Sequence, residues 1–290
     1  MNKISQFWPF IISLIFLSLS LFWVWQIRPT ASALPDNFRF DANVFSLDNF
    51  YDESNGDFSG QIESKTDFAY KVKDIKNGYF IIQNLFTVRK PSGEKIFSVE
   101  RNYGIDPKTG THVAGLGDHD RNGYLFAPKN LNKQDFTYWH VNYDTPARMV
   151  FAGEEEIMGL GVYRYEADYH ADQTENLGFL PGVGKTRGIE LDINLNLWIE
   201  PKTGRMVKYE DKTIAYYYDL KTKERINPWN KFSNKFKEES IKNQVGQIRF
   251  LKLKIFVFEW VIPTFGVLIS LITLVFSVKQ SKYKKKGGEI

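Results

Sequence analysis

Cysteine is absent from this chain of 290 residues. A disulfide framework and a cysteine-based zinc or iron–sulfur site are therefore excluded. Histidine is scarce, because the chain has only four, and none of them stands at the short spacing of a histidine metal centre. The remaining composition, with 43% apolar and 25% charged residues, excludes a disordered or collagen-like protein. We expect no bound cofactor.

Two long apolar runs stand near the ends of the chain. Residues 7–27 carry no charge, and residues 255–278 are interrupted only by Glu259. At about 1.5 Å per residue, each run is long enough to cross a hydrocarbon core of about 30 Å. We predict transmembrane helices at 7–27 and 255–278. A cleaved signal peptide is the alternative for the first run, because Ala31-Ser32-Ala33 resembles a cleavage site.

The distribution of lysine predicts the orientation of these helices. Five lysines follow the second run, and positively charged flanks stay on the cytoplasmic side of a membrane. We therefore predict a two-pass cell-membrane protein in contact with lipid, with residues 1–6 and 279–290 in the cytoplasm and residues 28–254 outside. Charges of the two signs balance within residues 28–254, so a nucleic-acid partner is not expected. The five lysines are Lys279, Lys282, Lys284, Lys285 and Lys286.

The segment between the two runs is dominated by a period of two. Residues 189–200 alternate aliphatic and mainly polar side chains, which is typical of a strand with one buried face. Similar strands, separated by turn residues, are predicted at 79–89, 95–105, 149–157, 160–169 and 213–220. We predict a mainly β domain over residues 28–226, built as one antiparallel sheet that is curved or barrel-like. The aliphatic residues of the best-defined strand are Ile189, Leu191, Ile193, Leu195, Leu197 and Ile199.

A membrane-proximal amphipathic helix is predicted over residues 227–254. Asn227 is a suitable N-cap residue and Pro228 suits the first helical position. Trp229, Phe232 and Phe236 follow at helical spacing. We expect this helix to cover the aliphatic face of residues 189–199. A gap between the helix and that face would form an apolar binding site, whereas complete coverage would indicate a scaffold.

Other candidate sites have weaker patterns. Asp118, Asp120 and Asn122 match the opening of a calcium loop, but Lys129 stands where the bidentate glutamate belongs, so the choice is between a partial calcium site and a solvated turn. Residues 182–186 imitate a phosphate loop without its first glycine, and we reject that interpretation. Arg28 and Glu259 lie near the same end of the two predicted spans, and we predict that they form an interhelical ion pair.

No nucleophile motif and no convergent pair of carboxylates stands out in the sequence. The three consecutive glutamates, Glu154 to Glu156, must alternate between the two faces of a strand and cannot act together. We therefore predict that the protein is not an enzyme.

Several segments together resemble the PorA-type family of membrane-anchored extracytoplasmic proteins. The most specific is Gly153-Glu-Glu-Glu-Ile157 followed by Gly159-Leu-Gly-Val-Tyr-Arg-Tyr165. Asp106-Pro-Lys-Thr-Gly110, Leu197-Trp-Ile-Glu-Pro-Lys-Thr-Gly204 and Leu34-Pro35 also match in order. The resemblance implies a single anchored domain of unknown function, and it supplies no catalytic residues. The word porin in the family name implies a channel component.

These observations lead to three functional hypotheses. The first is a binding or scaffold module of the cell envelope that holds a hydrophobic ligand or an envelope protein. The second is an accessory or sensor subunit of a membrane complex, which would need a partner. The third is the channel component that the family name implies. The ligand, the partner and the oligomeric state are left open by the sequence.

Overall fold

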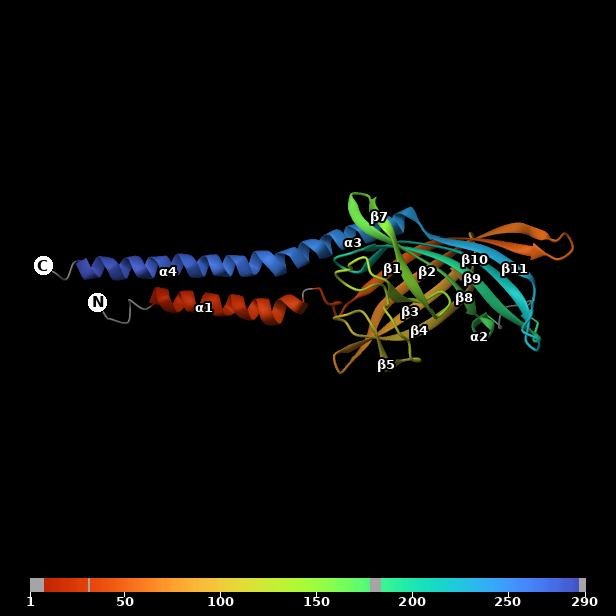
Figure 1. Ribbon diagram of the computed structural model, residues 1–290, viewed down its shortest axis with the longest axis horizontal. Helices are drawn as coiled ribbons and strands as arrows, with labels where there is room; N and C mark the ends of the chain where they lie inside the picture. Colours follow the sequence, from red (N-terminus) through yellow and green to blue (C-terminus); the bar gives the residue numbers. More distant parts are fainter. Residues whose placement is uncertain (1–7, 31, 178–183, 287–290) are drawn as a thin grey trace. The chain divides into compact units, whose positions relative to one another are not determined.

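A computed structural model describes residues 8–30, 32–177 and 184–286, and it divides the chain into two units (Figure 1). Leu34–Arg249 form one unit, and Met1–Ala33 with Phe250–Ile290 form the other. The rejected phosphate-loop pattern and the alternative cleavage site lie partly outside the described residues, at Gly182, Val183 and Ala31.

The larger unit is built around one sheet. Within the described residues, eleven strands pair antiparallel in the order β5-β4-β3-β2-β1-β11-β10-β9-β8-β7-β6 (Figure 1). The mainly β, antiparallel fold predicted from the sequence is thus confirmed. The strands are β1 (Arg39–Asp52), β2 (Asp57–Lys76), β3 (Tyr79–Arg89), β4 (Lys95–Ile105), β5 (His112–Gly117), β6 (Phe136–His140), β7 (Thr145–Ile157), β8 (Leu160–Asp172), β9 (Arg187–Glu200), β10 (Arg205–Asp219) and β11 (Arg225–Phe236).

A short segment around Tyr124 connects the two edges of the sheet. Tyr124 forms bridges to Thr111, next to β5, and to Tyr138 on β6. Its backbone N–H donates to Thr137 O over 2.9 Å, and its carbonyl accepts from Trp139 N over 3.0 Å. Gly123 has a φ of +76°, and a Cβ there would lie 2.4 Å from Thr137 O, so only glycine fits this approach. Gly123 and Tyr124 therefore link the two edge strands, β5 and β6.

The core fills the concave side of the curved sheet. All six aliphatic side chains predicted to share one face of β9 are 0–3% exposed and belong to this core. The same core contains Leu125, Phe126 and Leu131, which belong to the segment between β5 and β6. Phe126 of that segment reaches β1 and β2, with ring centroids 4.9 Å from Phe40 and 5.9 Å from Tyr70.

The predicted helix over residues 227–254 is wrong in its first part. Residues 225–236 form strand β11, which lies between β1 and β10, and the helix α3 begins only at Glu238 (Glu238–Phe256). Pro228 sits at a register shift, where Ala215 pairs with Asn230 but Tyr216 pairs with Pro228. A bulge is a position at which a sheet tolerates proline.

Helix α3 packs on the outer face of the sheet, not on the aliphatic face of β9. Val245 and Ile248 are buried against Trp198, Val207 and Val162. Ser240 Oγ accepts a hydrogen bond from Asn43 N over 2.8 Å, and Gln244 donates to Asp41 O over 3.1 Å, both on β1. The expectation that this helix covers residues 189–199 is therefore corrected.

The second unit contains two helices that are long and apolar enough to cross a membrane. The first is α1 (Trp8–Phe22), continued by a π-helical segment η2 (Trp23–Ile27) and a short 3-10 segment η3 (Arg28–Thr30). The second lies within Glu238–Lys279, where α3 continues through another π-helical segment, η4 (Val257–Val261), into α4 (Ile262–Lys286). The remaining helix of the chain's described part, α2 (Thr174–Leu177), belongs to the larger unit.

Small polar side chains join α1 to α4. Ser13 Oγ donates to the carbonyl of Ser270 over 2.8 Å, and Ser270 Oγ donates to the carbonyl of Ser13 over 2.9 Å. Gly266 allows close approach, because a Cβ there would lie 2.2 Å from Ser20 Oγ. Small residues and interhelical hydrogen bonds are the usual means of helix association in a membrane.

Candidate functional site

A cavity of about 570 Å³ lies on the concave side of the sheet, among strands β1 to β4 and β11. This volume falls within the range of about 300–1,000 Å³ that is usual for small-molecule sites. We call this space the inner cavity.

Most of the wall of the inner cavity is apolar. Phe68 and Phe86 lie edge to face, with ring centroids 5.2 Å apart, and Phe97 lies 5.9 Å from Phe86. At the rim, three large side chains are well exposed: Phe50 (38%), Ile62 (51%) and Ile96 (49%). Exposed apolar groups that continue into an apolar cavity are typical of a binding site for a hydrophobic ligand. The other apolar wall residues are Val44, Val88, Pro91, Val99, Trp229 and Phe232.

A row of polar side chains crosses this apolar wall. Ser46 on β1 pairs with Ser64 on β2 and with Asn234 on β11, and Asn234 pairs in turn with Asp211 on β10. Because paired residues on neighbouring strands point to the same face of a sheet, these four side chains form a line across its concave side. We call them the polar row. Ser46, Ser64 and Asn234 line the inner cavity.

A buried hydrogen-bond network stands behind the polar row. Asp211 accepts hydrogen bonds from Tyr209, from Asn234 over 2.7 Å and from Asn142 over 3.3 Å. His140 contacts the hydroxyls of Tyr169 and Tyr209, at 2.5 Å and 2.7 Å. The side chains of His140 and Asp211 are both fully buried. Asn142 and Asn234 thus join the buried network to the inner cavity.

Burial shifts the pKa values of both titratable groups in this network. It raises the pKa of Asp211 to about 6, although hydrogen bonds from Tyr209 and Asn234 oppose the shift. It lowers the pKa of His140 to about 3. His140 is therefore neutral at pH 7, so its two nitrogens act as one donor and one acceptor toward the two tyrosine hydroxyls.

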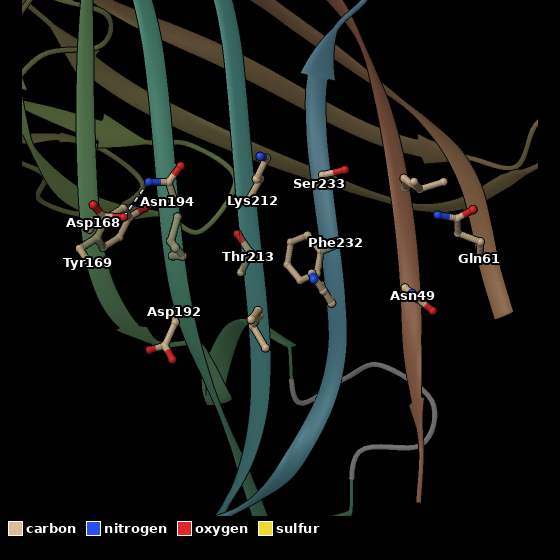
Figure 2. A pocket seen from close by; sticks show the side chains of 14 residues that line it. Asn49, Gln61, Asp168, Tyr169, Asp192, Asn194, Lys212, Thr213, Phe232 and Ser233 are labelled. Carbon is tan, nitrogen blue, oxygen red and sulfur yellow. Dashed lines mark hydrogen bonds between the residues drawn. The ribbon is translucent and has the colours of Figure 1, made fainter. Parts of the chain in front are cut away.

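A second hollow of about 780 Å³ crosses the outer face of the same sheet, from β8 to β2 (Figure 2). Its side chains are largely polar and of both charges, including Asp192 and Lys212. Asp192 already pairs with Arg225 and His170, at 3.0 Å each. Asp168 accepts a hydrogen bond from Asn194 over 2.7 Å. We call this hollow the outer groove. It offers less apolar surface to an acyl chain than the inner cavity does.

The residues that were predicted to form an apolar site fall into two groups in the structure, one in the core and one at the inner cavity. The six aliphatic residues of β9 belong to the protein core. The prediction that they form a ligand-binding face is therefore corrected. Trp229 and Phe232 line the inner cavity, although from strand β11 and not from a helix. Phe236 is buried in the core, 6.4 Å from the ring of Phe40. The row of Ser46, Ser64 and Asn234 was not predicted, because only the pairing of β1, β2 and β11 brings these residues together.

The calcium-loop pattern does not assemble a set of free ligands. Asp118 accepts a hydrogen bond from Arg121 over 2.5 Å and Asp120 accepts one from Gly115 N over 2.7 Å. In the part of the chain that the structure describes, no group of three or more His, Asp or Glu residues is arranged to hold a metal ion. The described geometry is that of a turn whose carboxylates bind other protein groups.

Arg28 and Glu259, which were predicted to form an interhelical ion pair, belong to the two apolar helices. The guanidinium of Arg28 lies over the ring of Trp260, 5.5 Å from its centroid, next to Glu259 in the sequence. Trp23 Nε1 donates to Phe258 O over 2.9 Å at the same level. This brings the ends of η2 and η4 together, while the ion pair between Arg28 and Glu259 stays a prediction.

Fold and site together define a mainly β domain with an inner cavity, carried by a chain with two apolar helices near its ends. Residues 117–278, more than half of the chain, match the family model described as Porin PorA. The protein belongs to the Porin PorA family. No curated protein matches it.

Solved structures give only distant similarities. The chain is 11% identical to a Bacteroides fragilis protein described as exported, with a YmcC-like fold, over 70% of this chain and 97% of that one, with a TM-score of 0.30. It is 9% identical to DynF from the dynemicin biosynthesis pathway of Micromonospora chersina, over 70% and 82%, with a TM-score of 0.24. It is 10% identical to a DUF1329 family protein of Desulfovibrio piger, over 77% and 90%, with a TM-score of 0.23. Similarities at this level carry no functional argument.

Proposed function

We propose that the protein is a membrane-anchored, extracytoplasmic binding module that holds the hydrocarbon chain of an amphiphilic ligand in the inner cavity. The observation that carries this proposal is the cavity itself, an apolar space of about 570 Å³ with an exposed apolar rim. Burying a large apolar side chain, or a hydrocarbon group of the same size, stabilises a fold or a complex by about 1.5–3 kcal/mol. An acyl chain that fills this space would therefore bind favourably.

A non-catalytic role agrees with the chemistry of the site. The nearest buried titratable side chains, His140 and Asp211, bind tyrosine and asparagine groups of the protein. Arg101, which also lines the cavity, donates to Val141 O over 2.6 Å and lies 3.6 Å from Asp144. These groups stabilise the cavity wall and are occupied by protein partners, so binding is the function that the site supports best.

Filling the inner cavity should abolish ligand retention. Val99 on β4 lines the cavity, and Val99→Trp would place a large ring inside it. Because the ring would occupy space that the acyl chain needs, and forcing both into it costs about 1–3 kcal/mol, we expect the amount of co-purified lipid to fall about tenfold or more. Native mass spectrometry of the full chain, purified in mild detergent, measures the bound mass.

Leu85→Trp is the matched control for this experiment. Leu85 lies on the neighbouring strand β3, is 43% exposed and does not line the inner cavity. This variant should retain lipid at the wild-type level. Equal retention by Val99→Trp, with a normal thermal unfolding curve, would show that the inner cavity is not the binding site.

The proposed orientation places the whole sheet outside the cytoplasm. It is supported by the lysines that follow the second apolar run and by the two helices that could span a membrane. Ser92, in the exposed turn between β3 and β4, gives a single labelling site when it is replaced by cysteine, because the chain has no cysteine. We expect Ser92→Cys to react with an impermeant maleimide in intact cells, and Ser281→Cys to react only after lysis. The reverse pattern would refute the orientation.

A further inference from the structure

The amide side chains around the inner cavity have their orientations set by Asp211. Asn234 donates from Nδ2 to Asp211 Oδ1 over 2.7 Å. Turning this amide over would place its oxygen against the carboxylate, which is unfavourable, so the carboxylate fixes the orientation of the amide. Asn234 therefore uses its amino group on the protein and can offer its oxygen, an acceptor, to the cavity that it lines.

Asn142 also uses its amino group to donate hydrogen bonds to the protein. Its Nδ2 donates to the Tyr209 hydroxyl over 2.7 Å and to Asp211 over 3.3 Å. Its Oδ1 is buried and has no hydrogen-bond partner among the described residues. A buried acceptor without a donor costs about 1–3 kcal/mol. A ligand that brings a donor to this position would recover that cost.

The hydroxyls of the polar row add two more sites that can accept. Ser64 lines the cavity, and the structure gives its hydroxyl no partner within the described residues. Ser46 has only a long contact of 3.5 Å, to Thr66. A serine hydroxyl can accept from one group and donate to another, so this pair suits a ligand hydroxyl better than a group that only accepts.

The charges around the cavity disfavour an anion. The two cations that line it are occupied: Arg101 lies 3.6 Å from Asp144, and Lys90 lies 2.9 Å from Glu94. Two acidic residues, Asp48 and Glu63, also line the cavity. Burial raises the pKa of the Asp48 carboxyl, although a hydrogen bond from Asn230 opposes the shift. A phosphate or carboxylate would thus meet acceptors and acidic groups.

We propose that the amphiphile held in the inner cavity has an uncharged head group with hydroxyl donors, which the oxygens of Asn142 and Asn234 and the hydroxyls of Ser46 and Ser64 receive. This inference rests on the proposed function and adds the class of ligand to it. The acyl chain lies along the wall of Phe68, Phe86 and Phe97, and the hydroxyls of the head group meet the polar row. Selectivity arises because a ligand without donors leaves the buried acceptor of Asn142 unpaired.

Four probes with the same C18 chain length test the proposal. The delipidated full chain in detergent is mixed with equal amounts of monooleoylglycerol, oleate, oleylamine and methyl oleate, and the bound species are quantified by native mass spectrometry. We expect monooleoylglycerol to be bound about tenfold or more over oleate and methyl oleate, whose head groups bring no hydroxyl donor. Equal or preferred binding of oleate or methyl oleate overturns the head-group inference, and preferred binding of oleylamine overturns the uncharged character of the head group. Each of these results leaves the proposed function intact. Binding of none of the four overturns both.

A pair of double variants ties the preference to the polar row. Ser46→Ala with Ser64→Ala removes the two cavity hydroxyls and should reduce the preference for monooleoylglycerol over methyl oleate by about tenfold. Ser98→Ala with Ser233→Ala removes two hydroxyls from residues outside the cavity lining, on β4 and β11, and should leave the preference unchanged. If both double variants keep the wild-type preference, the polar row does not recognise the head group.

Discussion

Leu195→Ala is expected to lower the free energy of unfolding by about 2–5 kcal/mol, because it deletes a large side chain from a closely packed core. Leu195 is 0% exposed and lies in the middle of β9. It is covered by other protein groups and not by a ligand. The cost should therefore be the same whether or not lipid is bound.

Leu85→Ala is the comparison, because the same atoms are removed from a side chain that is 43% exposed. It should change the free energy of unfolding by about 0.5 kcal/mol or less. Denaturant unfolding of the full chain in detergent, followed by tryptophan fluorescence, measures both variants. A Leu195→Ala effect as small as that of Leu85→Ala would mean that the β9 face does not form the core.

The pH dependence of stability should reveal two opposing contributions from the buried network. The pKa of His140 falls from 6.5 to about 3 on folding. Below pH 6.5 the unfolded chain takes up a proton that the folded chain does not, so stability is lost as the pH falls. The pKa of Asp211 rises from 3.8 to about 6. Between these values the folded chain holds a proton that the unfolded chain lacks, so stability is lost as the pH rises.

Between pH 4 and 6 the two slopes, each about 1.4 kcal/mol per pH unit, nearly cancel in the native protein. We expect His140→Gln to leave only the Asp211 contribution, so that this variant becomes more stable as the pH falls from 6 to 4. Asp211→Asn should show the opposite slope. Thermal and denaturant unfolding across this range compare the variants with the native chain. Three parallel curves would mean that neither group titrates differently in the folded state.

The strand pattern of the sheet could largely be read from the sequence. Strands β3 and β4 have the predicted bounds, and the β7–β8 turn at Met158 and Gly159 has positive φ at both residues, 50° and 75°, as a tight hairpin requires. Buried alternation was clear in these elements because aliphatic and aromatic side chains occupy nearly every inward position. The prediction failed where inward positions carry polar residues.

Strand β11 shows the physical reason for that failure. Its inward positions alternate between asparagine and phenylalanine, as in Asn230, Phe232, Asn234 and Phe236. The asparagines hide the period of two, and the remaining spacing of Trp229, Phe232 and Phe236 imitates a helix. Asn230 and Asn234 face inward because Asp48 and Asp211 accept their hydrogen bonds. Such partners are far apart in the sequence, so a local pattern cannot reveal them.

The sequence by itself determined the two apolar helices, the mainly antiparallel sheet and the family, since each of these depends on runs or periods within a few neighbouring residues. Tertiary structure alone decided which apolar face is core and which is cavity. The aliphatic side chains of β9 join the core with Leu125, Phe126 and Leu131, whereas side chains of β1 to β4 and β11 line the inner cavity. It also decided the polar row, because Ser46, Ser64, Asn234 and Asp211 meet only through the pairing of four strands.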